Sequence, residues 1–325
     1  MNYIYYIYIV YMKDIFELLK KWDWRLVAIL QIPFTIAYIL IPRYVTKYYN
    51  TQSLVSYKFT ITTLISAVYL FLLKKFTFYK WLIPAGFIVQ FAMYYQYLSI
   101  KESPNAGLAN ASIQSSNLIF DQLMGYLLFG TQLTMKSILG VLITIIGVIT
   151  MAFKSNSSIN NFKWIFLALL GGVLQGSKDM IVKYLGIIHG NKKLDIMSLG
   201  TVLFGIAGIL SFIIQYYQTN TILPVLNKDT NKKSDKKSDK KSDKNYKLAL
   251  FAMLLAGING FFILNIYNVL TEISPSPAYS TLPGVIAIIF SSIIDAYLEN
   301  SALTYKEIMG MITIIFGTGV ISYNN

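Results

Sequence analysis

Long apolar runs, separated by short polar stretches, dominate the pattern of this chain. A membrane-spanning helix needs about 20 mostly apolar residues, and ten runs approach or exceed that length. They predict helices at 25–44, 54–73, 81–100, 104–129, 136–153, 164–185, 194–217, 248–271, 277–298 and 305–323. Because most connections between them are short, consecutive helices are expected to run antiparallel. The predicted fold class is an all-α polytopic membrane protein with ten transmembrane helices.

Three segments fall outside these runs. Residues 1–24 are apolar and rich in Tyr at first, then mix Phe16 and Leu19 with charges. This predicts an N-terminal interfacial segment with an amphipathic helix, the alternative being a frayed terminus. Residues 154–163 form a polar linker. The Lys-rich segment 227–247 repeats Lys-Lys-Ser-Asp and is expected to be disordered, because it is too polar to pack into a core.

Composition narrows the possible functions. Residues of the set AVILMFWYC make up 55% of the 325 positions and charged residues only 13%, far below the roughly 25% charged of soluble domains. The chain has no cysteine and one histidine, which excludes disulfides and a multi-histidine metal site within one chain. The net charge is +13, but nine lysines lie between 228 and 247. We therefore expect a lipid bilayer as partner, no nucleic acid and no cofactor.

The ten predicted helices look like two copies of five. A shift of 170 residues superposes Gly140 on Gly310 and Gly147 on Gly317. A unit with an odd number of spans must face the opposite way in its second copy. The sequence therefore predicts an inverted-topology repeat, with halves at 25–153 and 164–323, as in many secondary transporters.

Two stretches carry a resemblance to a known family. Tyr97 is followed by Glu102-Ser103-Pro104, and the second half holds Tyr267, Glu272 and Ser274-Pro275 in matching places. With a final helix carrying Gly-x6-Gly, residues 25–323 resemble the drug/metabolite transporter superfamily. Residues 174–183, Pro283-Gly284 and the long loop after the seventh helix are similar to its chloroquine-resistance-transporter-like branch, although that branch usually has cysteines in this loop. The resemblance implies alternating access around a central site between the two halves.

Polar residues inside the spans are the candidate site. The fourth predicted helix holds Asn110, Gln114, Asn117 and Asp121 on one face, because three- and four-residue spacings repeat along a helix. The ninth holds Asp295. The resemblance places these two helices near the symmetry axis, so both carboxylates are expected at one cavity, where they would bind a proton or attract a cationic solute. The alternative is that both acids cap or anchor helices near the headgroups.

Other spans add weaker candidates. They are Gln31 in the first, Tyr94 in the third, and Lys178 and Asp179 in the sixth. Adjacent helical residues point about 100° apart, so the last two need not pair with each other. Packing is the alternative for each Tyr, and helix–helix contacts for the amides. Lys58 in the second span is predicted to extend toward the headgroups.

These observations predict a secondary-active transporter of a small organic solute or metabolite, and not an enzyme. An intramembrane enzyme or a channel remains the alternative. Short loops carry 11 basic residues on the side of the termini and six on the other, which favours cytosolic termini. The membrane could be the plasma membrane or an intracellular one, and a homodimer is possible. The glycines at 140, 147, 310, 317 and 319 predict close helix packing.

Overall fold

The structure is a computed structural model that describes Phe16 and residues 18–130, 134–152, 162–188, 196–227, 239–274 and 282–322. Within these residues the chain is helical, apart from short connections and one isolated bridge between Tyr49 and Leu226. The helices are α2 (Trp24–Val45), α3 (Thr51–Leu72), the 3-10 turn η1 (Lys80–Leu82), α4 (Ile83–Glu102), α5 (Ala106–Phe129), α6 (Met135–Ala152), α7 (Lys163–Ile188), α8 (Ile196–Thr219), α9 (Asp239–Ile273), α10 (Leu282–Leu298) and α11 (Tyr305–Ser322).

Local sequence accounts for several helix ends. Asn50 caps α3 by accepting a hydrogen bond from the backbone N–H of Ser53 at 2.7 Å. Asn105 caps α5 in the same way, through the N–H groups of Gly107 and Leu108. Such caps satisfy N–H groups that have no partner inside the helix. At its other end α5 stops at Gly130, whose φ of 63° is a left-handed conformation that glycine adopts freely.

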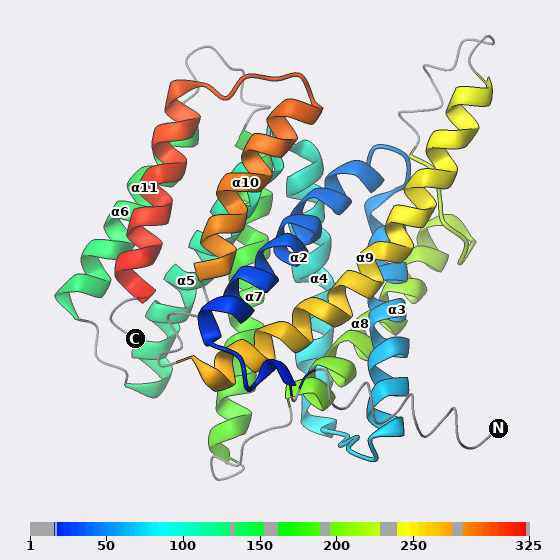
Figure 1. Cartoon of the computed structure of the whole chain (residues 1–325), viewed down its shortest axis with the longest axis horizontal. Helices are drawn as coiled ribbons and strands as arrows, with labels where there is room; N and C mark the ends of the chain where they lie inside the picture. The colour runs from blue at the N-terminus through cyan, green and yellow to red at the C-terminus, as the bar shows by residue number, and fades with distance from the viewer. Residues whose placement is uncertain are drawn as a thin grey trace.

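The helices pack in a defined set of pairs. The helices α6 and α11 lie side by side at one end of the molecule, and α3 and α8 lie toward the other (Figure 1). Between them α4 and α5 pack on α7, while α2 packs on α9 and α10. Further contacts join α3 to α9, α4 to α8 and α5 to α10. The bundle therefore mixes helices from the first and second halves of the chain throughout.

The pairing of α6 with α11 depends on glycine. A Cβ atom at Gly147 would lie 2.8 Å from the carbonyl oxygen of Gly310, and one at Gly317 would lie 2.8 Å from that of Gly140. Both distances are too short for any other residue. The prediction of close packing at these four glycines is confirmed, whereas Gly319 has no neighbour within 4 Å and takes no part.

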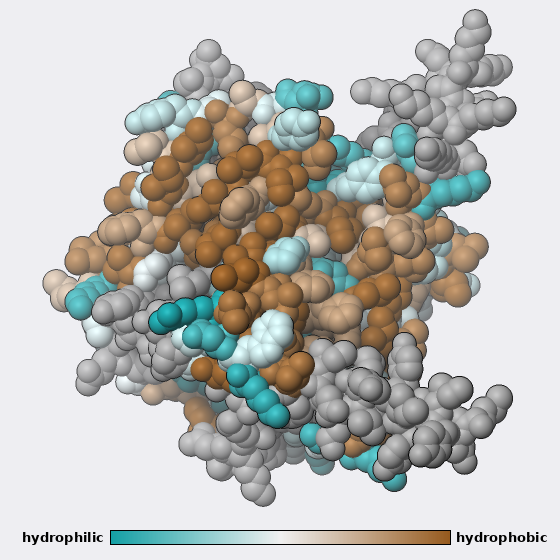
Figure 2. All heavy atoms as spheres, in the orientation of Figure 1, coloured by the Kyte–Doolittle hydropathy of each residue, from teal (hydrophilic) through white to brown (hydrophobic). Residues whose placement is uncertain are grey.

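The surface of this bundle is largely apolar. A continuous apolar face covers the helices in the view of Figure 2, with hydrophilic residues toward the ends. In the described part of the chain, five helices are long and apolar enough to cross a membrane: Trp24–Val45, Thr51–Leu72, Lys163–Leu185, Met197–Thr219 and Asn245–Tyr267. Exposed apolar side chains on this scale are costly in water, so the protein is an all-helical membrane protein.

The boundaries differ from expectation at the Lys-rich segment 227–247. Helix α9 begins at Asp239, so residues 239–247 of this segment are helical, whereas the sequence predicted disorder. Helix propagation explains this, because extending an existing helix into water adds a hydrogen bond per residue. The first residue is also ordered: the N–H of Asn227 donates to the carbonyl of Tyr48 at 2.8 Å. Residues 228–238 lie outside the described part.

Most of the predicted N-terminal segment also lies outside the described residues. Its described part docks on the bundle. The ring of Phe16 lies 5.9 Å from that of Tyr69 and 6.2 Å from that of Phe261, and Leu19 is buried. This end of the segment is therefore packed against α3 and α9 and is not frayed.

Candidate functional site

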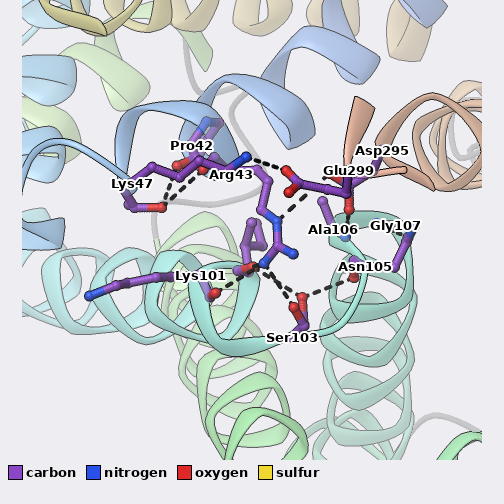
Figure 3. Close-up of polar contacts among 12 residues, drawn as sticks. Pro42, Arg43, Lys47, Lys101, Ser103, Asn105, Ala106, Gly107, Asp295 and Glu299 are labelled. Carbon is purple, nitrogen blue, oxygen red and sulfur yellow. Dashed lines mark hydrogen bonds and ion pairs between the residues drawn. The ribbon is translucent and has the colours of Figure 1, made fainter. Parts of the chain in front are cut away.

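One polar cluster joins the C-terminal part of α2 to α4, α5 and α10 (Figure 3). At its centre Arg43 donates through Nη1 to the carbonyl oxygens of Ile100, Lys101 and Ser103 at 2.7, 3.0 and 2.8 Å. Its Nε lies 3.7 Å from Oδ1 of Asp295. An arginine has five N–H donors in a fixed plane, and here one side chain fixes the end of α4 to α10.

Asp295 completes this cluster by capping α5 from outside. Its Oδ2 accepts a hydrogen bond from the N–H of Ala106 at 2.8 Å, and the Nδ2 of Asn105 donates to the carbonyl of Ser292 at 2.8 Å. A carboxylate at the first turn of a helix also interacts favourably with the helix dipole. Nearby, Lys47 and Glu299 form an ion pair. Asp295 is therefore buried, charge-paired and fully used in holding helices together.

The expectation that Asp121 and Asp295 share one cavity is wrong. Asp295 binds the first residue of α5, and Asp121 lies 15 residues further along that helix. At 1.5 Å per residue this separates them by about 22 Å along the axis. The superfamily resemblance identified the contact between α5 and α10, but that contact occurs at the start of α5, where Gly107 packs on α10. For Asp295, the alternative of a capping role is the one that the contacts support.

A second polar cluster lies between α5 and α7. A Cβ atom at Gly176 would lie 2.9 Å from Oδ1 of Asp121 and 3.0 Å from Oδ1 of Asn117. Both oxygens are buried and accept no hydrogen bond from the described residues. On the same helix as Gly176, Lys178 and Asp179 form an ion pair with each other, a pairing that the sequence had left open. Asp121 is close enough to interact electrostatically with both.

The remaining candidates are scattered. Asn110 is buried in α5, whereas Gln114, on the face predicted to be shared, is exposed. Gln31 is buried in α2, and its Oε1 lacks a partner among the described residues. The half-buried Tyr94 packs its ring 5.6 Å from that of Tyr95. These four contribute to neither cluster.

A third site was not predicted. Lys58 of α3 is 4% exposed, so it does not extend toward the headgroups as expected. Its ammonium hydrogen-bonds the hydroxyl of Tyr97, lies 3.8 Å from the ring centroid of Tyr38 and 4.9 Å from that of Tyr97, and is 3.9 Å from Sδ of Met93. The Tyr38 hydroxyl donates to the same sulfur at 3.3 Å. We call Lys58, Tyr38, Met93 and Tyr97 the lysine cage.

Buried amides lie at the same interface of α3 and α4. Nε2 of Gln52 donates to the carbonyl of Ser211 at 2.9 Å, and Nε2 of Gln90 donates to Oε1 of Gln52 at 3.3 Å. The Ser211 hydroxyl donates to Oε1 of Gln90. This closed network, together with the lysine cage, makes the α3–α4 interface markedly polar for the interior of a membrane protein.

Comparisons with known proteins show a shared fold but identify no family. No protein-family model matches the chain, and no curated protein does. Among the solved structures that match is one described only as "Crystal structure of protein", with a TM-score of 0.57 and 12% sequence identity, covering 91% of this chain and 94% of its own. At this identity the match shows a shared fold over nearly the whole chain, and nothing about function.

Proposed function

We propose that the protein is a secondary-active transporter of a small organic solute, built from two inverted halves of five spans each. The support comes from the pattern of helix packing. In the proposed repeat, α2 to α6 correspond in order to α7 to α11. If the halves are related by a two-fold axis, exchanging each helix for its counterpart must turn every packed pair into another packed pair.

The nine most extensive pairs satisfy this condition, whereas smaller contacts such as α5–α11, α4–α5 and α2–α4 have no counterpart of similar extent. Exchange turns α4–α7 into α9–α2, α5–α7 into α10–α2, and α3–α9 into α8–α4, and all six of these pairs pack closely. The pairs α3–α8, α5–α10 and α6–α11 are each their own counterpart and would lie on the axis. Inverted repeats of this kind supply two similar gates around one central site.

Asp121 is the residue that we propose for coupling transport to protons or charge. Its buried Oδ1 and that of Asn117 pack directly against Gly176, where no larger residue would fit. Buried acceptors without a donor are rare in proteins and are costly unless something satisfies them. A proton, or a donor group on the solute, would do so.

The competing function of an intramembrane protease loses its support. Such an enzyme needs two carboxylates close enough to share a proton, whereas Asp121 and Asp295 are about 22 Å apart along α5. Asp295 is also occupied by Arg43 and the N–H of Ala106.

The test is solute counterflow with purified protein in liposomes. Preloading the vesicles with an unlabelled transported solute should accelerate uptake of the labelled one, which a channel does not do. Asp121→Asn should lower the rate by about 10- to 100-fold, the effect expected from losing a charged hydrogen-bonding group. Asp23→Asn is the matched control, because Asp23 caps α2 at the surface and Asn caps helices equally well. Counterflow unchanged in Asp121→Asn would remove Asp121 from the mechanism.

A further inference from the structure

The lysine cage holds a cation that the fold does not neutralise. The described parts of α2, α3, α4, α8 and α9 provide no carboxylate that pairs with Lys58: the ion pairs seen between described residues are Arg43–Asp295, Lys47–Glu299, Lys163–Glu102 and Lys178–Asp179. Burying an unpaired ammonium costs several kcal/mol. Two aromatic rings, a hydroxyl and a thioether recover part of that cost, but none of them carries a charge.

We propose that Lys58 is the residue that binds an anionic group of the transported solute, and that this group is a carboxylate. The inference rests on the proposed transport function for the statement that the ligand is the solute. The ammonium has three donors, and the cage provides one full hydrogen bond, to Tyr97, and a long contact to Met93 at 3.9 Å. Donor capacity is therefore left for a ligand, and a carboxylate would supply the negative charge that the cage lacks.

The surroundings favour a single negative charge. Arg43 lies five residues from Tyr38 along α2, but its Nη1 is engaged by three carbonyl groups and its guanidinium pairs with Asp295. Lys58 is therefore the one basic residue of the lysine cage available to bind an anion. A phosphate group carries more charge and is usually held by arginines or by several donors, whereas a carboxylate matches one ammonium. Lys58 is itself 4% exposed, and its ammonium lies against the rings of Tyr38 and Tyr97.

The location suits a solute site. Tyr38, Lys58 and Tyr97 come from three different helices, α2, α3 and α4. The backbone of Lys58 also lies against α9, where a Cβ atom at Gly257 would be 3.3 Å from its carbonyl oxygen. Helix α3, which carries Lys58, therefore packs on a helix of the other proposed half, so the cage lies next to the interface that would change in alternating access.

The experiment measures ligand-dependent thermal unfolding of the purified full chain in detergent. The probes are three isosteric sets: benzoate, benzamide and benzylamine; hexanoate, hexanamide and hexylamine; and lactate, lactamide and 1-aminopropan-2-ol. We expect at least one carboxylate to raise the unfolding temperature when its amide and amine do not. Lys58→Met should weaken that binding by about 10- to 100-fold, since it removes a charged hydrogen-bond donor.

Lys80→Met is the matched control. Lys80 also makes a cation–π contact, 5.0 Å from the ring of Trp81, but it is exposed, and its substitution should leave carboxylate binding unchanged. The wild-type comparison within each set tests the charge of the ligand without any variant. No carboxylate-specific shift, equal or stronger shifts from the amides or amines, or unaltered binding in Lys58→Met would each overturn the proposal.

Failure of this inference can be told from failure of the proposed function. If carboxylates bind in a Lys58-dependent way but no bound compound shows counterflow, the proposed transport function is wrong and the proposed anion site stands. Counterflow restricted to cationic or neutral solutes would leave transport and overturn the anion site.

Discussion

Two cations on consecutive helices, the partly buried Arg43 of α2 and the buried Lys58 of α3, have very different surroundings. Nη1 of Arg43 donates to three carbonyl groups and the guanidinium pairs with Asp295, although its Nε has no hydrogen-bond acceptor among the described residues. Lys58 has a hydroxyl, two rings and a sulfur around it, and no carboxylate pairs with it in the described part of the chain. A cation that pairs with a carboxylate joins helices. A buried cation without such a partner costs folding free energy that the described contacts do not fully offset. The contrast separates a residue kept for folding from one that we assign to binding.

The largest loss of stability should come from breaking the cluster of Arg43, Asp295 and the carbonyl groups at the end of α4. Arg43→Met leaves Asp295 buried without its charge partner and frees three carbonyl groups at the end of α4. Breaking a buried ion pair from one side costs about 3–5 kcal/mol. We expect little folded protein, measured as the monodisperse fraction in detergent and the unfolding temperature. A variant as stable as wild type would show that Arg43 is not what holds α4 to α10.

A smaller loss is expected from the other side of the same cluster. Asp295→Asn keeps an oxygen that can accept from the N–H of Ala106 but removes the charge beside Arg43. The cost should be about 1.5–3 kcal/mol, the value of a hydrogen bond to a charged group. The double variant Arg43→Met/Asp295→Asn should be less destabilised than the sum of the single ones, because the orphaned charge is absent. Additive losses would argue against a direct interaction.

The opposite sign is expected at the lysine cage. Lys58→Met replaces a buried ammonium by an apolar side chain of similar length, and such replacements are neutral or stabilising by about 1–4 kcal/mol. The unfolding temperature without ligand should therefore stay the same or rise. A fall in unfolding temperature as large as that of Arg43→Met would mean that both cations stabilise the fold, and the assignment of Lys58 to binding would be wrong.

The smallest effect is expected at the rim of the same cluster. Lys47 pairs with Glu299, but their side chains are 42% and 27% exposed. Lys47→Met should cost at most about 1 kcal/mol, as exposed ion pairs do, and high salt should reduce that difference further. A larger loss in the same unfolding assay would show that the whole cluster acts as one unit.

The sequence predicted the helices well and their contacts poorly. Nine of the ten predicted runs start within three residues of a helix or enclose its start, because hydrophobic length is a local property. The exception is the run predicted at 248–271, whose helix α9 starts nine residues earlier, at Asp239. Polar residues next to an apolar run can extend the helix into water. The glycines of α6 and α11 were also predictable, as their spacing marks a face that only a closely packed partner helix can cover.

The candidate site was less predictable, because its geometry depends on where helices cross. Asp121 and Asp295 occupy related places in sequence, yet α10 meets α5 at its first turn and not near Asp121. Lys58 gave no signal of its own, since an isolated lysine near the start of an apolar run usually extends to the headgroups. Only the convergence of Tyr38, Met93 and Tyr97 from two other helices shows that it is enclosed.

The closely packed pair α6–α11 has a consequence for the bilayer around it. Each helix has 18 residues, or about 27 Å of length, and the glycine contacts leave little freedom to slide. A typical hydrocarbon core is about 30 Å thick, and compensating for a mismatch costs a fraction of a kcal/mol per ångström. In the ten-span arrangement proposed here, the mismatch of about 3 Å over the described residues is met by thinning of the adjacent lipid or by flanking side chains that reach the headgroups. The pair therefore favours thin bilayers over thick ones, whatever the solute.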